Sequence, residues 1–326
     1  MLVDSRARKF SYLRLSLTEA CNFSCRYCLP SGYAPRDPGL PSELSESEVR
    51  NLLLGFEAAG FSKVRFTGGE PTLRRDLAGI IAFAASLPGF KFRALTTNGW
   101  NLKREAATYR LAGLQALNIS VDSLDPGRFR MLTGRDRLNE VLDGIDQALS
   151  LHFDSIKLNA VLHREHARDE LELFLNYVKT RPLTVRFIEL MKTGKGGIYR
   201  DAHFLSSGEM KLELLRQGWR PIERTVSGGP ALELSHPDFQ GRIGLIAPHA
   251  EGFCSTCNRL RVSSTGALRL CLFGEGNHDL REFLQSPEKA LALPERLASL
   301  LKLKAPSHRL LEGETGNLGG FSEIGG

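Results

Sequence analysis

Apolar and polar residues follow two alternating periods through the first two thirds of the chain. Short apolar runs of strand length recur, and helix-like segments separate them. A capping-box pattern at Ser45–Glu48 precedes one helical run, which stops at Gly60. The pattern predicts strands at Leu13–Leu17, Val64–Thr67, Phe92–Thr97, Ala116–Val121, Ser155–Leu162 and Val185–Leu190. Further helices are expected at Arg75–Ser86, Lys103–Ala112, Leu138–Leu151 and Arg168–Lys179.

Repeated βα units form either an open doubly wound sheet or a barrel. Polar residues gather at or just past the predicted strand ends, at Thr18, Glu19, Gly68–Pro71, Thr97–Gly99, Ser120, Asp122, Asn159 and Glu189. Several strands that contribute to one mouth are typical of a barrel, whose active site lies at the carboxyl ends of its strands. The sequence therefore predicts an α/β fold, an incomplete (βα)6 TIM-like barrel that is open on one side.

The pattern of residues along the chain changes after residue 190. A glycine- and lysine-rich loop at 192–197 marks the expected boundary between a partial barrel at 1–190 and an α+β extension at 191–326. Strands are expected in the extension at Ala231–Ser235 and Arg242–Ala247. This C-terminal region is expected to cover the open side of the barrel.

Composition narrows the class of protein. The chain has 326 residues, of which 42% are hydrophobic and 25% are charged, so it can bury a large core. Its longest stretch of low polarity, Ala78 to Leu87, is too short to cross a membrane, and the N-terminus has no apolar run suited to secretion. We therefore expect a soluble cytoplasmic protein with no membrane partner. The net charge of +6 indicates an anionic partner without identifying it.

The six cysteines fall into two groups of three, which suggests two metal centres rather than disulfides in a reducing compartment. Cys21, Cys25 and Cys28 follow the first predicted strand. Three thiolates this close can hold a four-iron cluster and leave one iron without a protein ligand. A zinc site is the alternative, but it would need a remote fourth ligand, because no histidine occurs before His152.

The second group, Cys254, Cys257 and Cys271, also leaves one ligand position open. Arg259 and Arg261 follow it closely, and guanidinium groups suit phosphate oxygens. A zinc ribbon that lacks one cysteine remains an alternative for this group, with the Arg-Leu-Arg run as an ordinary strand that has one wet face.

The Cys21-x3-Cys25-x2-Cys28 loop, with Tyr27 before the last cysteine and Gly68-Gly69-Glu70-Pro71 after the second strand, resembles the radical S-adenosylmethionine enzymes. Together with the second cysteine group and the final Gly325-Gly326, the chain resembles the GTP 3′,8-cyclase family of molybdenum cofactor biosynthesis over nearly its whole length. The resemblance implies a radical SAM barrel, two 4Fe-4S clusters, S-adenosylmethionine as cofactor and GTP as substrate. In that superfamily, reductive cleavage of S-adenosylmethionine yields a 5′-deoxyadenosyl radical.

The resemblance also implies roles for single residues. Contacts to S-adenosylmethionine fall on Tyr27, Gly68, Gly69, Ser120 and Met191. Contacts to GTP fall on Arg14, Lys63, Arg65, Thr96, Lys157, Arg186, Arg259, Leu260 and Arg261. The residues themselves support part of this assignment, because a charge within a βα strand is costly unless it faces the mouth and meets an anion. Gly325 and Gly326 are implied to enter the active site and position GTP.

The sequence leaves two alternative functions open. The alternatives are another radical SAM enzyme that acts on a peptide or an RNA, and a zinc-bearing nucleic-acid binder without catalytic activity. The expected partners are GTP, a reductant for the cluster and the next enzyme of the pathway, cyclic pyranopterin monophosphate synthase, with no DNA. The oligomeric state is undetermined, with a homodimer as one option.

Overall fold

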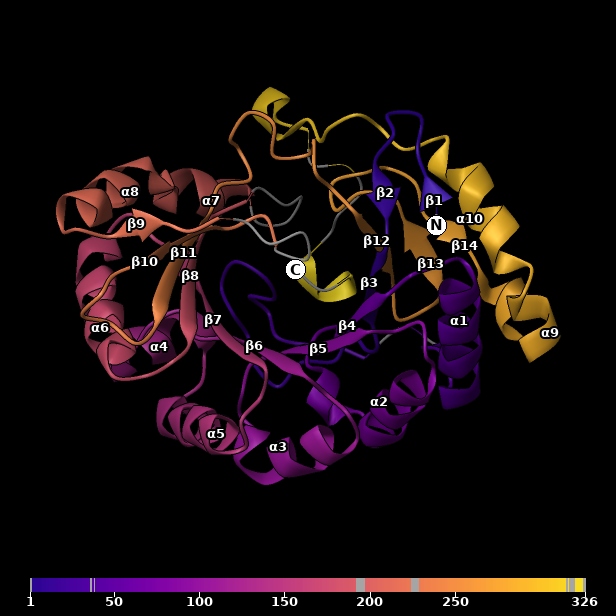
Figure 1. The fold of residues 1–326 in the computed structure, drawn as a ribbon, viewed down its shortest axis with the longest axis horizontal. Helices are drawn as coiled ribbons and strands as arrows, with labels where there is room; N and C mark the ends of the chain where they lie inside the picture. Colours follow the sequence, from indigo (N-terminus) through magenta and orange to yellow (C-terminus); the bar gives the residue numbers. More distant parts are fainter. Residues whose placement is uncertain are drawn as a thin grey trace.

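The structure is a computed structural model that describes residues 2–35, 37, 39–191, 197–223, 229–314, 316 and 320–324. Six parallel strands lie side by side in chain order and form a curved sheet (Figure 1). They are β3 (Tyr12–Ser16), β4 (Lys63–Thr67), β5 (Phe92–Thr97), β6 (Ala116–Ser120), β7 (Ser155–Leu162) and β8 (Thr184–Glu189). All six predicted strands are thus confirmed, and so is the partial barrel.

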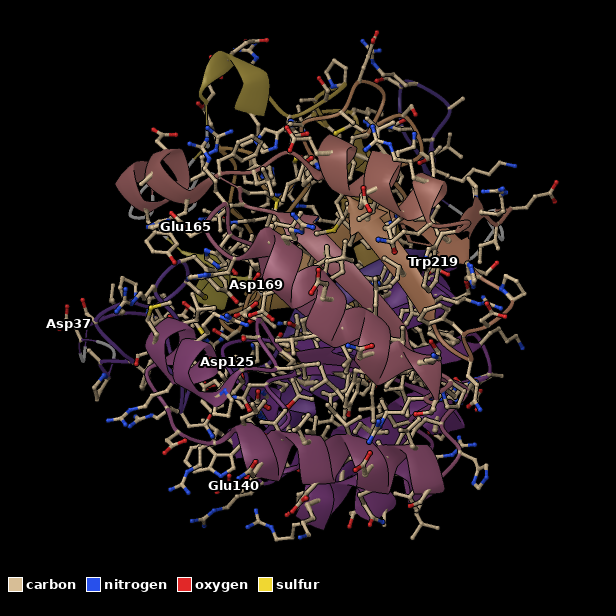
Figure 2. The ribbon with its side chains drawn as sticks, turned by 90° about the vertical axis from the view of Figure 1, so that its left-hand side faces the viewer. Asp37, Asp125, Glu140, Glu165, Asp169 and Trp219 are labelled. Atoms are coloured by element: carbon tan, nitrogen blue, oxygen red, sulfur yellow. The ribbon has the colours of Figure 1, made fainter. Side chains whose placement is uncertain are left out.

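The two faces of this sheet have different side chains because alternate residues of a strand point in opposite directions. Leu13 and Leu15 of β3, with Val64 and Phe66 of β4, are fully buried against the outer helices. These helices are α1 (Glu46–Ala58), α2 (Leu77–Ser86), α3 (Leu102–Leu111), α4 (Pro126–Thr133), α5 (Leu138–Ser150) and α6 (Ala167–Lys179). Figure 2 shows Glu140 on α5 and Asp169 on α6 on the outer side of this layer.

Local capping explains where helices begin. The predicted capping box is present at α1, where the Ser45 hydroxyl accepts a hydrogen bond from the backbone of Glu48 and the Glu48 side chain accepts one from the backbone of Ser45. Helix α4 was not predicted. Its Asp125 cap, followed by Pro126 at the first turn, is the signal that could have revealed it.

The extension continues the barrel sheet at both edges. Strand β11 (Arg242–Ile246) pairs in parallel with β8, and β12 (Arg259–Val262) pairs in parallel with β3. In the described residues the full order is β14-β13-β12-β3-β4-β5-β6-β7-β8-β11-β10-β9. The extension therefore adds strands to the open barrel as well as side chains over its mouth, and the boundary at 190/191 stays a prediction.

The remaining elements complete the extension and the N-terminal ribbon. The strands are β1 (Leu2–Val3), β2 (Lys9–Phe10), β9 (Arg220–Pro221), β10 (Leu232–Ser235), β13 (Ala267–Arg269) and β14 (His278–Asp279). The helices are α7 (Gly197–His203), α8 (Ser207–Arg216), α9 (Pro287–Ala290) and α10 (Leu293–Leu301). Short 3-10 turns are η1 (Pro71–Leu73), η2 (Arg281–Leu284), η3 (Leu310–Glu312) and η4 (Phe321–Glu323). Helices α9 and α10 pack beside α1 (Figure 1).

Most of the predicted boundary loop, residues 192–196, lies outside the described residues. Within the described part of the chain, no helix has both the length and the apolar character needed to cross a membrane.

Candidate active site

The first cysteine group lines a cavity of about 170 Å³ at the carboxyl ends of the barrel strands. Its loop follows β3 and is held by backbone hydrogen bonds from Ser24 to Thr133 and from Arg26 to Leu132, at the end of α4. Inside the loop, the backbone N–H of Cys28 donates to the carbonyl of Cys25 at 3.0 Å. The loop is therefore shaped by the protein itself and presents three free thiols to one cavity.

The thiols of this group suit a metal cluster. Burial raises the pKa of Cys21 to about 11 and that of Cys28 to about 12. Burial also raises the pKa of Cys25 well above its usual value, and the neighbouring Asp122 and the other two thiols raise it further. Since a thiol ligates as the thiolate, binding of a metal cluster here must displace the thiol protons to solvent. Three thiols from one short loop, facing one cavity, fit an iron–sulfur cluster with one open iron.

Gly68 and Gly69 form a turn that presses on the cysteine loop. A Cβ on Gly68 would lie 2.3 Å from the carbonyl oxygen of Thr18, and a Cβ on Gly69 would lie 2.3 Å from that of Ala20. Gly68 also has φ of +152°, which favours glycine. The structure thus adds a reason for this pair beyond close approach to a ligand, because any side chain here would push the cysteine loop away.

Glu70, the next residue, ties the turn to β5. Its buried carboxylate accepts hydrogen bonds from the hydroxyls of Thr72 and Thr97, both at 2.7 Å, and from the backbone of Asn98 at 2.6 Å. The sequence had marked this residue only as part of the turn. Its hydrogen bonds therefore hold the ends of β4 and β5 together beside the cavity.

Tyr27 and Asp122 connect the cysteine loop to the far wall of the cavity. The Tyr27 hydroxyl donates to Asp122 at 2.9 Å, and the second oxygen of Asp122 accepts from the backbone of Val161 at 3.0 Å. Burial raises the pKa of Asp122 to about 6. Ser120 and Met191 line the same cavity, so the five residues implied for S-adenosylmethionine are brought together with the three cysteines.

A second cavity, of about 320 Å³, lies next to the first. The two share four lining residues, Thr96, Asn159, Ile188 and Met191. The second cysteine group lines this cavity, together with every cation that the sequence assigned to GTP: Arg14, Lys63, Arg65, Lys157, Arg186, Arg259 and Arg261. The tertiary structure therefore unites residues from both ends of the chain in one cation-rich chamber.

Burial and mutual repulsion lower the pKa values of several cations that line this chamber. Burial, together with the neighbouring cations, lowers the pKa of Arg14 to about 9, that of Arg186 to about 10 and that of Lys63 to about 8. Lys157 forms an ion pair with Glu233 at 2.6 Å. Arg186 donates two hydrogen bonds to Asn159, at 3.0 and 2.7 Å. Buried cations this close together are stable only when anions lie beside them, and the oxygens of a polyphosphate supply such anions.

The thiols of the second group differ from those of the first. Burial raises the pKa of Cys257, but Arg259 and Lys304 outweigh it and lower the pKa to about 7. Cys257 therefore ionises readily to a thiolate, and the cations beside it would balance the negative charge of a metal cluster bound there. As at the first site, three free thiols face one cavity, which fits a cluster with an open iron. No set of three His, Cys, Asp or Glu side chains in the described residues is arranged for a single metal ion.

Leu260 stays a predicted GTP contact, but it differs in direction from its two arginine neighbours. Its side chain is fully buried in the hydrophobic core and does not line the cavity. The reason is the alternation of β12, which turns Arg259 and Arg261 towards the chamber and Leu260 away from it.

The C-terminal segment lies between the two cysteine groups. Phe321 and Ser322 line the first cavity, and their backbone amides hydrogen-bond to the thiol of Cys28. Ile324 packs in an apolar cluster with Phe273 and Leu272, beside Cys271. This yellow segment lies inside the curve of the sheet (Figure 1). Gly325 and Gly326 themselves lie outside the described residues.

Several lining residues were not singled out from the sequence. They are Tyr12, Asn118, Phe253, Phe273 and His308. Tyr12 and Asn118 could have been found, because each lies two positions along a strand from a predicted inward residue, on the same face. The others come from loops of the extension, whose placement no local pattern specifies.

Comparison with known proteins agrees with this geometry. Residues 15–178 match the Radical SAM superfamily, and residues 183–310 match Molybdenum Cofactor Synthesis C. A GTP 3′,8-cyclase of Synechococcus elongatus is 46% identical over 326 residues, which are 100% of this chain and 99% of the relative. A GTP 3′,8-cyclase of Klebsiella pneumoniae is 48% identical over 325 residues, again 100% of this chain and 99% of the relative.

A solved structure is similar in fold. The crystal structure of Streptococcus suis SuiB bound to S-adenosylmethionine superposes with a TM-score of 0.63 at 12% identity, over 90% of this chain and 68% of that one. At this identity the likeness concerns the fold alone. The full-length relatives, the two matching families and the paired cysteine sites lead to one conclusion: the chain belongs to the GTP 3′,8-cyclase family of the radical S-adenosylmethionine superfamily.

Proposed function

We propose that the protein converts GTP to (8S)-3′,8-cyclo-7,8-dihydroguanosine 5′-triphosphate, the first step of molybdenum cofactor biosynthesis. The single observation that carries the proposal is the shared wall of Thr96, Asn159, Ile188 and Met191 between the two cysteine-lined cavities. A cofactor in the first cavity and a nucleotide in the second would meet at this wall. The names of the full-length relatives support the same reaction.

The first cavity would hold S-adenosylmethionine and a 4Fe-4S cluster on Cys21, Cys25 and Cys28. When bound, that cluster supplies the electron that cleaves S-adenosylmethionine. The protein's own part is to shape the cavity. Gly68 and Gly69 keep the cysteine loop in place, and the Tyr27–Asp122 hydrogen bond fixes the wall opposite the turn.

The second cavity would hold GTP. Its cations bind and orient the triphosphate, and burial in a low-dielectric chamber strengthens each charge-assisted contact. Cys254, Cys257 and Cys271 would hold a second 4Fe-4S cluster on the side of the nucleotide base. The contacts of single residues with GTP and S-adenosylmethionine belong to this proposal.

The wider setting is also proposed. The reaction needs an external reductant, and cyclic pyranopterin monophosphate synthase would consume the product in the cytoplasm. The segment at 320–324 leads into the region between the two cavities, which supports a role for Gly325 and Gly326 in positioning GTP.

Anaerobic turnover tests the function. Protein reconstituted with iron and sulfide is incubated with GTP, S-adenosylmethionine and dithionite, and the products are identified by mass spectrometry. We expect 5′-deoxyadenosine and cyclised nucleotide in equal amounts, with about eight irons per chain. Formation of 5′-deoxyadenosine with unchanged GTP, when reductant and clusters are complete, would contradict the assignment of the substrate.

A further inference from the structure

Tyr12 lies at the base of the cation-lined chamber, where its phenol ring meets two cations. It is 8% exposed and lines the cavity. The side-chain Nε of Arg65 donates a hydrogen bond to its oxygen at 2.5 Å. The Lys63 ammonium lies 4.7 Å from the centre of its ring. A phenol oxygen in this position is an acceptor for a guanidinium that is assigned to the triphosphate.

Cations surround Tyr12 on its own strand and on the strands around it. Arg14 lies on the same strand, Lys63 and Arg65 lie on β4, Arg186 lies on β8, and Arg259, the register partner of Tyr12, lies with Arg261 on β12. The titratable thiols of the second cysteine group line the same chamber. Burial raises the pKa of Tyr12, but Arg65, Arg14 and Lys63 outweigh it and lower the pKa to about 7. The phenol oxygen is thus well placed to carry the negative charge that this group of cations attracts.

We propose that Tyr12 is a positioning residue that serves as an internal counter-anion: its phenolate holds Arg65 while the chamber is empty, and an incoming polyphosphate replaces that charge as the phenolate takes up a proton from solvent. The inference rests on the proposed function, because the nucleotide site is assigned there. It adds a group that titrates in step with substrate binding.

The coupling follows from electrostatics. A bound triphosphate satisfies the cations and repels a second anion, so it returns the pKa of Tyr12 towards its ordinary value. Binding then consumes a proton above neutral pH, and affinity for polyphosphate falls by up to about tenfold per pH unit there. Lys63, whose pKa is lowered to about 8, loses its charge in the same range and weakens binding as well. The measurement must therefore detect the phenolate itself.

Ultraviolet difference spectroscopy on the cluster-loaded protein, without S-adenosylmethionine, makes this test. The probe is inorganic tripolyphosphate, which has no absorbance in the phenolate band. We expect the free protein to show one phenolate band with a midpoint near pH 7, so that roughly nine-tenths of Tyr12 is ionised at about pH 8. Saturating tripolyphosphate at that pH should abolish the band, and GTP should do the same.

Two phenylalanine variants assign the signal. Tyr12→Phe should lack the band, whereas Tyr109→Phe, which changes a buried tyrosine on α3 outside both cavities, should keep it. If Tyr12→Phe does not fold, Arg65→Gln serves instead and should move the midpoint upward by about one pH unit or more. The inference is overturned if the wild type shows no phenolate at pH 8, if tripolyphosphate leaves the band unchanged, or if the band survives in Tyr12→Phe or keeps its midpoint in Arg65→Gln. A band that responds to tripolyphosphate but not to GTP would contradict the proposed substrate and leave the role of Tyr12 intact.

Discussion

Arg261 of β12 is the register partner of Arg14 of β3, although 246 residues separate them in the sequence. On the other side of β3, Arg14 pairs in register with Arg65 of β4. Three arginines on neighbouring strands therefore form one row that faces the chamber. The extension supplies one of the three arginines of this row, so the proposed nucleotide site needs the sheet to be continued beyond the barrel.

We expect Arg261 to contribute to GTP binding and to lower the stability of the nucleotide-free protein. It is buried, its Nε has no hydrogen-bond partner in the described residues, and burial together with Arg259 lowers its pKa. We expect Arg261→Met to weaken GTP binding by about tenfold or more, a loss of roughly 1.5–3 kcal/mol, and to raise the melting temperature of the nucleotide-free protein. Calorimetric titration and thermal unfolding measure the two effects.

Arg93→Met is the matched control. Arg93 lies on β5 outside both cavities and donates to the carbonyls of Gly113 and Phe90. It should lower the melting temperature and leave GTP affinity unchanged. Unchanged affinity in Arg261→Met would mean that the row does not bind the triphosphate.

The first cysteine group should be required for cleavage of S-adenosylmethionine. Replacing Cys21, Cys25 or Cys28 by Ala leaves only two thiolates for the cluster, which should be lost or misplaced. Production of 5′-deoxyadenosine under dithionite should then fall to background. Normal production by any one of the three variants would falsify the assignment of this site.

The second group should be required for cyclisation only. A triple variant of Cys254, Cys257 and Cys271 to Ala should keep about half of the iron and the ability to cleave S-adenosylmethionine, because these thiols line only the second cavity. Cyclised nucleotide should disappear. If GTP were cyclised at the normal rate, the second group would have only a structural role.

The terminal glycines should affect product formation alone. Deletion of Gly325 and Gly326 should leave both clusters and S-adenosylmethionine binding intact and reduce cyclised product sharply. A synthetic peptide with the missing end should restore part of the activity. Full activity of the shortened chain on its own would show that the two residues are dispensable.

The ionisation of Glu48 should make the free energy of unfolding depend on pH. Arg281 of η2 donates to its carboxylate at 2.8 Å, which joins the extension to the capping box of α1. Burial raises the pKa of Glu48, but the hydrogen bonds of Arg281 and Ser45 outweigh it and lower the pKa to about 2. A depressed carboxylate pKa stabilises the fold above its unfolded value of 4.5, and this contribution is lost as the pH falls from 4.5 towards 2.

Glu48→Gln should therefore cost about 1 kcal/mol in the free energy of unfolding at pH 7, and the difference from wild type should shrink below pH 4. Glu46→Gln is the control, because Glu46 pairs with Arg50 on the surface of the same helix and is 40% exposed. Denaturant unfolding measured at several pH values tests both. An equal cost for the two variants at every pH would rule out a special role for Glu48.

The barrel and part of its site could be predicted from the amino-acid sequence. Strand and helix periods located all six strands to within one residue at their first position, because buried parallel strands are short continuous apolar runs. The resemblance to a known family assigned the residues of the two sites. The charges within strands supported part of that assignment, because a charge there is costly unless it meets an anion.

Pairing between distant segments could not be predicted from the sequence. No local pattern indicates that β12 adds to β3 or that β11 adds to β8, since such pairing depends on which open edge each strand reaches. The direction of the Leu260 side chain and the position of Tyr12 beside Arg259 and Arg261 follow from that pairing. The hydrogen bonds of Glu70 with the end of β5 also depend on the tertiary structure. Which face of the sheet a side chain points to depends on the register of its strand. Long-range packing sets that register.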